Sequence, residues 1–200
     1  MKIAILGWGS LIKEPRGLPI VGEWQKDGPT LWIEFSRISK AGERAGCLTL
    51  VVDERHGSEV TTLHVLSQRT ELTQAIADLR EREGTSEHDI GFCEVAAGRF
   101  ASTALSRHPK SCDRIRAWAL GKGCDAAVWT ALPCRFKDAI GIPFTPAAAL
   151  KYLDGLPAPT RDRALQYIRN APEQTMTAFR RLLLAQSSAE RASPPRSESL

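Results

Sequence analysis

The chain has 200 residues, of which 42% are hydrophobic and 25% are charged. This balance is typical of a globular protein and excludes a mainly disordered, collagen-like or coiled-coil chain. No apolar stretch approaches the roughly 20 residues of a membrane-spanning helix, and the first apolar run, residues 3–6, is too short for a signal peptide. We therefore expect a cytoplasmic protein that has no membrane partner.

The charge balance and the cysteine spacing argue against nucleic-acid binding, a disulfide framework and a zinc site. The 27 basic and 23 acidic residues give a net charge of +4 without a long run of like charges, so nucleic-acid binding is not indicated. The five cysteines include no C-x-x-C pair, which predicts neither a disulfide framework nor a zinc site. Reduced thiols are expected.

The first third of the chain is predicted to consist mainly of strands. An apolar run at residues 2–6 predicts a strand that ends at a glycine-rich turn. Residues 13–29 are rich in Gly and Pro and are predicted to form a loop. Segments rich in β-branched and aromatic residues then predict three strands, whose short connections favour antiparallel pairing. We expect these strands at 31–38, 46–52 and 60–66.

Helices enter the pattern after residue 67. Leu72, Ala75 and Leu79 have helical spacing between Ser67, a suitable N-cap, and Gly84, which ends the pattern. The core is therefore predicted to mix strands and helices in an α+β fold. The later elements are expected as a strand at 90–96, a helix around 113–120 and a strand at 126–132.

The C-terminal part is predicted to be helical. Thr145 caps a helix that begins at Pro146, Thr160 caps a second helix, and Pro172 opens a third. We expect one domain over residues 1–185, with a core at 1–135 and a helical extension at 145–185. Residues 186–200 are rich in Ser, Pro and Arg and are predicted to form a disordered tail.

The turn Gly7-Trp8-Gly9-Ser10 is the first candidate for a binding site. It lacks the third glycine of a dinucleotide-binding loop, and Pro15 and Gly17 prevent the long helix that such a loop requires. Unpaired backbone N–H groups at Gly9, Ser10 and Leu11 can converge on an anion such as a carboxylate or an oxyanion. The alternative is a tight turn that only reverses the chain.

Two carboxylates, Glu81 and Glu83, lie at the end of the predicted helix beside Arg80 and Arg82. A solvated, charged helix end is the ordinary interpretation of such a run. The C-terminal end of a helix dipole, however, disfavours a carboxylate anion. A carboxyl group in this position suits the transfer of protons near neutral pH.

Together these motifs resemble the γ-glutamylcyclotransferase superfamily. The turn Trp8-Gly9-Ser10-Leu11 follows the first strand, antiparallel strands come next, and a helix ends in Leu79-Arg-Glu-Arg-Glu83-Gly84. The resemblance covers residues 1 to about 135. It implies a small mixed, largely antiparallel β-barrel with flanking helices and a site at the barrel mouth. Trp8 stands where the family usually has tyrosine, and Arg80 where aspartate is common.

The resemblance also implies an activity. Residues Gly7, Trp8, Gly9, Ser10 and Leu11 would bind a small-molecule γ-glutamyl substrate, and Glu83 would be the general acid/base. The reaction cyclises the γ-glutamyl group to 5-oxoproline and releases the amine, as in an amide-cleaving lyase or an acyltransferase, and no metal or organic cofactor is implied. The alternative from another class is a non-catalytic protein that binds a small molecule or a partner on the same fold.

Three other patterns remain as alternatives, and the sequence leaves the oligomeric state open. Two cysteines and a histidine in predicted strands would suit a cysteine hydrolase if they faced one another, although buried cysteines usually only fill space. Tryptophans among basic residues would suit base stacking, although such tryptophans more often pack a core. The helical extension would also suit a dimer interface. The residues concerned are Cys47, Cys93 and His64 for the hydrolase, and Trp24, Trp32, Trp118 and Trp129 with Arg114, Arg116 and Lys122 for nucleic acid.

Overall fold

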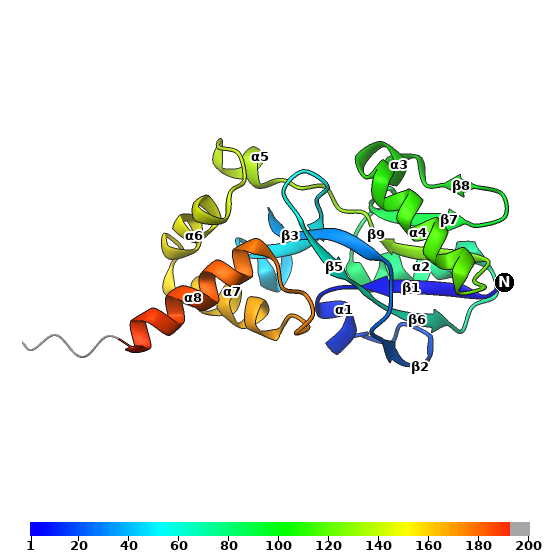
Figure 1. Ribbon diagram of the computed structural model, residues 1–200, viewed down its shortest axis with the longest axis horizontal. Helices are drawn as coiled ribbons and strands as arrows, with labels where there is room; N and C mark the ends of the chain where they lie inside the picture. Colours follow the sequence, from blue (N-terminus) through cyan, green and yellow to red (C-terminus); the bar gives the residue numbers. More distant parts are fainter. Residues whose placement is uncertain (193–200) are drawn as a thin grey trace, which may run out of the picture.

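The computed structural model describes residues 1–192, with side chains up to residue 188, and is a mixed α+β protein built on two sheets (Figure 1). The larger sheet has the strand order β2-β6-β1-β9-β7-β8 and the smaller one the order β4-β3-β5. The strands are β1 (Ile3–Gly7), β2 (Ile20–Gln25), β3 (Thr30–Ile38), β4 (Leu48–Val52), β5 (Ser58–Thr61), β6 (Leu63–Ser67), β7 (Ile90–Glu94), β8 (Arg99–Phe100) and β9 (Ala126–Thr130).

Helices cover the larger sheet and form the opposite end of the molecule, where α5 to α8 lie together (Figure 1). The α-helices are α1 (Ser10–Lys13), α2 (Leu72–Glu83), α3 (Ser102–Arg107), α4 (Pro109–Gly121), α5 (Phe136–Ile140), α6 (Pro146–Asp154), α7 (Ala158–Asn170) and α8 (Ala178–Ala192), and two short 3-10 helices are η1 (Gly42–Arg44) and η2 (Glu87–Asp89). No helix of the described residues is long and apolar enough to cross a membrane.

The first strand lies inside the larger sheet because both of its faces are apolar. All five residues of β1 are buried. Ile3 and Ile5 pack in one apolar cluster with residues of α2, whereas Ala4 and Leu6 belong to the cluster between the two sheets. Side chains alternate across a strand, so a short continuous apolar run suits a position covered on both sides. β1 pairs parallel with β9 and antiparallel with β6. The other strand pairs of the described residues are antiparallel, so the pairing is largely antiparallel, as predicted.

The strand predicted at 60–66 is divided between the two sheets. β5 pairs with β3 in the smaller sheet, and β6 pairs with β1 and β2 in the larger one. The chain changes sheet at Thr62, whose carbonyl accepts the N–H of Gly28 and whose own N–H donates to Pro29. The described strands form two sheets rather than one closed sheet, so the predicted barrel is not confirmed.

The predicted loop at 13–29 contains a strand, β2, which was missed. It lies at the edge of the larger sheet, and its register shifts between Val21 and Gln25. Gly22 has a φ of +73° there, a conformation that favours glycine. An irregular edge strand tolerates glycine and neighbouring proline better than a central strand does, which explains why the composition indicated a loop.

Helix α2 is confirmed, but its predicted cap is wrong. The helix begins at Leu72 after Glu71, and no side chain caps it. Ser67 is instead the last residue of β6, where its hydroxyl accepts the N–H of Arg69. The short helices α3 and α5 were not predicted, because fewer than two turns give too few positions for helical spacing to be read.

The C-terminal extension is helical, with two corrected boundaries. Thr145 caps α6 as predicted, since its hydroxyl accepts the N–H of Ala148. Thr160 is not a cap, because α7 begins two residues earlier at Ala158, and Pro172 does not open α8, which begins at Ala178. Helix α8 continues to Ala192, so the predicted disordered tail is wrong for 186–192; its remaining part, 193–200, lies outside the described residues.

A buried arginine explains why the segment before α8 is not helical. The guanidinium of Arg180 donates to the carbonyl oxygens of Pro172 and Thr175. It also donates to the carbonyl oxygens of Arg169 and Ala171 at the end of α7. These bonds satisfy buried backbone acceptors that a continuous helix would have paired internally, and so they stabilise an irregular connection.

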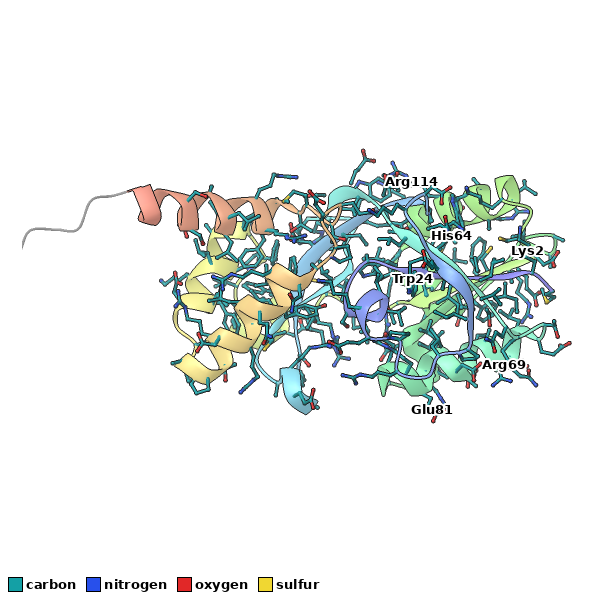
Figure 2. All side chains as sticks on the ribbon, turned by 90° about the horizontal axis from the view of Figure 1, so that it is seen from below. Lys2, Trp24, His64, Arg69, Glu81 and Arg114 are labelled. Carbon is teal, nitrogen blue, oxygen red and sulfur yellow. The ribbon has the colours of Figure 1, made fainter. Side chains whose placement is uncertain are left out.

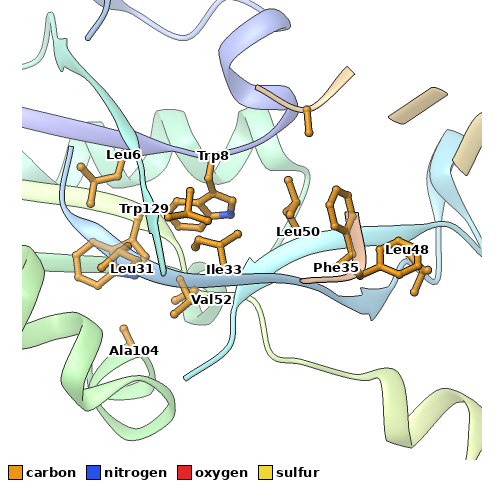
Figure 3. Packing of buried hydrophobic residues seen from close by; sticks show 14 of the residues in the cluster. Leu6, Trp8, Leu31, Ile33, Phe35, Leu48, Leu50, Val52, Ala104 and Trp129 are labelled. Carbon is orange, nitrogen blue, oxygen red and sulfur yellow. The ribbon is translucent and has the colours of Figure 1, made fainter. Parts of the chain in front are cut away.

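One apolar cluster joins both sheets to the C-terminal helices. Figure 3 shows its central part, in which Trp8 and Trp129 pack beside Ile33. Phe35 of β3 contacts Phe179 of α8, with ring centroids 5.7 Å apart. The extension therefore packs against the smaller sheet through the same continuous core that holds the two sheets together.

Candidate functional site

The turn after β1 is shaped by two close approaches to its glycines. A Cβ atom at Gly7 would lie 2.9 Å from the indole of Trp24, and one at Gly9 would lie 3.2 Å from the Tyr167 hydroxyl oxygen. A side chain at either position would therefore force these neighbours to shift. The turn then enters the single-turn helix α1 at Ser10.

The backbone of this turn presents unpaired donors. Among the described residues, the N–H groups of Gly9, Ser10 and Leu11 have no hydrogen-bond acceptor. The carbonyl of Trp8, by contrast, accepts the buried hydroxyl of Thr175 at 3.0 Å. The turn is thus fixed on its carbonyl side while its N–H groups remain free for a ligand.

Glu83 is the last residue of α2, which ends because Gly84 adopts a left-handed conformation with a φ of +59°. The Glu83 side chain is 17% exposed, and its Oε1 accepts a hydrogen bond of 2.6 Å from Nη1 of Arg82. Oε2 has no partner among the described residues. One oxygen of the carboxylate is therefore anchored and the other is available.

Arg82 is itself fixed by the chain that follows α1. Its side chain is only 4% exposed, and Nε and Nη2 both donate to the carbonyl oxygen of Glu14, at 3.1 and 2.6 Å. A planar guanidinium that makes several such bonds has little freedom to move. Arg82 consequently fixes the position of Glu83 relative to the segment that carries the turn.

A small cavity of about 40 Å³ lies between the turn and the end of α2. The structure brings together all of the sequence-predicted site residues here, although Glu83 is far from the turn in sequence. Glu81 does not belong to the cavity, and Figure 2 shows it at the surface. The lining includes the predicted Gly7, Trp8, Gly9, Ser10, Leu11 and Glu83, together with Leu50 and Tyr167.

Trp8 contributes to the site mainly through its backbone. The residue is 4% exposed, and its indole packs in the apolar cluster beside Trp129 and Ile33 (Figure 3). The larger aromatic group thus fills space between the two sheets. It offers no phenol to a ligand.

Tyr167 of α7 supplies a phenol to the cavity and was not among the predicted site residues. Its hydroxyl accepts the N–H of Leu50 at 3.4 Å and faces Gly9. Burial raises the pKa of Tyr167, so the hydroxyl is protonated at neutral pH. In the sequence, Tyr167 is only one apolar residue on an amphipathic helix, and no local signal indicates that α7 reaches the turn.

The residues of the two alternative sites, the cysteine hydrolase and the base-stacking surface, have other surroundings in the structure. Cys47 and Cys93 are buried, and burial raises the pKa of the Cys93 thiol to about 11, so it is not a thiolate at neutral pH. His64 lies instead beside Asp27, with Nδ1 3.3 Å from Oδ1. Among the tryptophans, Trp129 is fully buried, and Trp32 is covered by the guanidinium of Arg114 at 3.7 Å.

Neither a metal-binding cluster nor a relative identifies the site. Within the part of the chain that the structure describes, no three His, Cys, Asp or Glu side chains are grouped so as to hold a metal ion. Comparisons with protein-family models, curated proteins and solved structures found no significant match.

Proposed function

We propose that the protein is a γ-glutamylcyclotransferase-like enzyme that converts a small γ-glutamyl amine or peptide to 5-oxoproline and releases the amine. The observation that carries this proposal is the meeting of the Glu83 carboxylate with the glycine turn in one cavity. A proton-transfer group and a set of free backbone donors are the two components that this intramolecular reaction needs.

The reaction can be assigned to the groups present. The α-amino nitrogen of the γ-glutamyl group forms a bond to its own γ-carbonyl carbon, and the bond from that carbon to the leaving nitrogen breaks. The α-ammonium nitrogen loses two protons as it becomes the lactam N–H. Glu83 relays them one after the other through its unpartnered Oε2 to the leaving nitrogen, which departs as an ammonium ion. The free N–H groups of the turn hold the substrate carboxylate or the developing oxyanion.

Tyr167 and Arg82 support these steps without exchanging protons in the proposal. The protonated Tyr167 hydroxyl lines the cavity close to Gly9 and can donate a hydrogen bond to the substrate. It supplies from α7 the phenol that Trp8 does not provide. Arg82 is a positioning residue, because it holds the Glu83 carboxylate through Oε1.

The size of the cavity sets a requirement for binding. A volume of about 40 Å³ accommodates only a few water molecules and is smaller than a γ-glutamyl group. Ser10 and Tyr167 separate this cavity from a neighbouring hollow of about 210 Å³. Displacement of the Tyr167 side chain would join the two spaces, so binding requires a local rearrangement.

A panel of γ-glutamyl amines and peptides tests the proposal through the appearance of 5-oxoproline. Replacement of Glu83 by Gln keeps the shape of the side chain but removes the titratable group, and turnover should then fall by about 10² to 10⁴. Glu81→Gln is the matched control, because Glu81 is exposed and does not line the cavity. Equal turnover in the two variants would remove Glu83 from the mechanism.

A non-catalytic binding protein is the second candidate. The small cavity and the indole of Trp8 packed beneath the turn favour it, because both leave little room for a reacting substrate. This alternative predicts no 5-oxoproline from any member of the panel, while ligands still protect the protein against thermal unfolding.

A further inference from the structure

A second hollow of about 210 Å³ adjoins the cavity that contains Glu83. We call it the basic hollow, because Lys13, Arg44 and Arg163 contribute to its lining. Ser10 and Tyr167 line both spaces and form the wall between them. A ligand that extends from the cavity past this wall enters the basic hollow.

The three cations come from separate parts of the chain, namely α1, η1 and α7. Nη1 of Arg44 donates to Ser10 Oγ at 2.9 Å, and its guanidinium carbon lies 4.9 Å from the Tyr167 ring centroid. Arg44 is therefore held against the wall that the two spaces share. Arg163 and Lys13 line the same hollow from α7 and α1.

The positive charge of the basic hollow is only partly compensated. Neither Lys13 nor Arg163 has an ion-pair partner among the described residues, and Arg163 donates a hydrogen bond to the neutral hydroxyl of Thr160. The lining also contains Glu14 and Glu43.

Of the two carboxylates, Glu14 is already engaged. Its Oε2 lies 3.3 Å from both Arg16 and Arg44. The three lining cations thus outnumber the two carboxylates, and the charge of Glu14 is shared with Arg16, which lies outside the lining. An arginine that has used two of its five N–H groups retains donors for a ligand.

We propose that the basic hollow binds a carboxylate, and, resting on the proposed function, that this carboxylate belongs to the amine part of the substrate that leaves. Arginine recognises a carboxylate with two parallel hydrogen bonds, and Lys13 would add a point charge. A hollow of about 210 Å³ is below the roughly 300–1,000 Å³ of a pocket for a whole drug-sized molecule, so it suits one part of a small substrate.

Two substrates that differ in one group test the source of the carboxylate. γ-Glutamylglycine carries a carboxylate on its leaving amine, and γ-glutamylmethylamide does not. In Arg163→Gln and Lys13→Gln, KM for γ-glutamylglycine should rise by about tenfold, the loss expected for one charge-assisted hydrogen bond, while KM for the methylamide stays unchanged. Arg161→Gln is the control, because Arg161 is an exposed residue of α7 that pairs with Asp154.

Direct binding of succinate separates this inference from the cyclotransferase proposal. If neither substrate yields 5-oxoproline, the proposed reaction fails, and weaker succinate binding to Lys13→Gln and Arg163→Gln than to Arg161→Gln would still support a site for a separate carboxylate. The inference is overturned if the two variants change KM for both substrates alike. In the absence of turnover, succinate binding that is undetectable or insensitive to the substitutions also overturns it.

Discussion

Replacement of Arg82 by Gln tests whether the Glu83 carboxylate is held in place as the structure describes. The substitution removes two part-buried hydrogen bonds from a charged donor to the carbonyl oxygen of Glu14, which are together worth about 1.5–3 kcal/mol. It also removes the 2.6 Å bond to Glu83, worth about 1–2 kcal/mol for a partly exposed ion pair. We expect a loss of about 3 kcal/mol in the free energy of unfolding, a large part of the stability of an ordinary domain.

The assay is urea denaturation followed by tryptophan fluorescence, with Arg80→Gln as the matched control. Arg80 lies on the same helix and is exposed, and its side chain makes no hydrogen bond or ion pair with a described residue. Its replacement should change the free energy of unfolding by less than about 0.5 kcal/mol. Equal stability of the two variants would refute the reasoning, because it would mean that the hydrogen bonds of the Arg82 guanidinium add nothing to the stability of the fold.

A double-mutant cycle then isolates the contact between the two side chains. If Arg82 holds Glu83, the effect of Arg82→Gln should be about 1 kcal/mol smaller in the background of Glu83→Gln than in the natural chain. The part of the effect that comes from the Glu14 carbonyl should remain in both backgrounds.

Three further predictions concern the site, the acid stability and a helix cap. Gly9→Ala places a methyl group 3.2 Å from the Tyr167 hydroxyl oxygen, so turnover should fall at least tenfold while circular dichroism stays unchanged; full turnover would contradict the proposed site. Burial alone would raise the pKa of Asp53, but the nearby Ser36 hydroxyl and the hydrogen bonds from the His56 N–H and imidazole outweigh it and lower the pKa. The ionised group therefore stabilises the fold above its ordinary pKa of about 3.8, and this contribution disappears as the pH falls through the lowered value. Asp53→Asn should therefore be less stable at pH 6 and approach the natural chain in acid, as measured by unfolding at each pH; parallel curves would argue against the assignment. Thr145→Ala should lose about 0.5–2 kcal/mol in urea denaturation, and Thr160→Ala less, because only Thr145 caps a helix; the reverse order would show that the cap lies elsewhere.

The elements that the sequence predicted correctly are those whose local pattern agrees with their tertiary surroundings. The apolar run of β1, the helical spacing of α2 and the Thr145-Pro146 start of α6 are each stabilised locally and again by packing. The β2 strand was not predicted, because its extended conformation depends on pairing with β6 and not on its own composition. The break at Thr62 likewise depends on contacts with Gly28 and Pro29, which are distant in sequence.

In the candidate site, too, some features can be predicted from the nearby sequence and others depend on contacts between distant segments. Gly9 marks the turn and Gly84 marks the end of α2, and the neighbouring sequence predicts both. The contributions of Arg82 and Tyr167 depend on which segments meet. Arg82 lies in a charged run that suggested only a solvated helix end, yet its side chain is buried against the Glu14 carbonyl. Tyr167 reaches the turn only because α7 packs beside it.

The hydrogen bond from Thr175 to the Trp8 carbonyl couples the C-terminal helices to ligand binding. Both groups are buried, and the bond joins the segment between α7 and α8 directly to the glycine turn. A ligand held between that turn and Tyr167 would bind only when these helices are docked, so it would stabilise their docking by the same free energy. Hydrogen exchange in α7 and α8 should accordingly slow when the site is occupied, which would make the far end of the molecule a reporter of its occupancy.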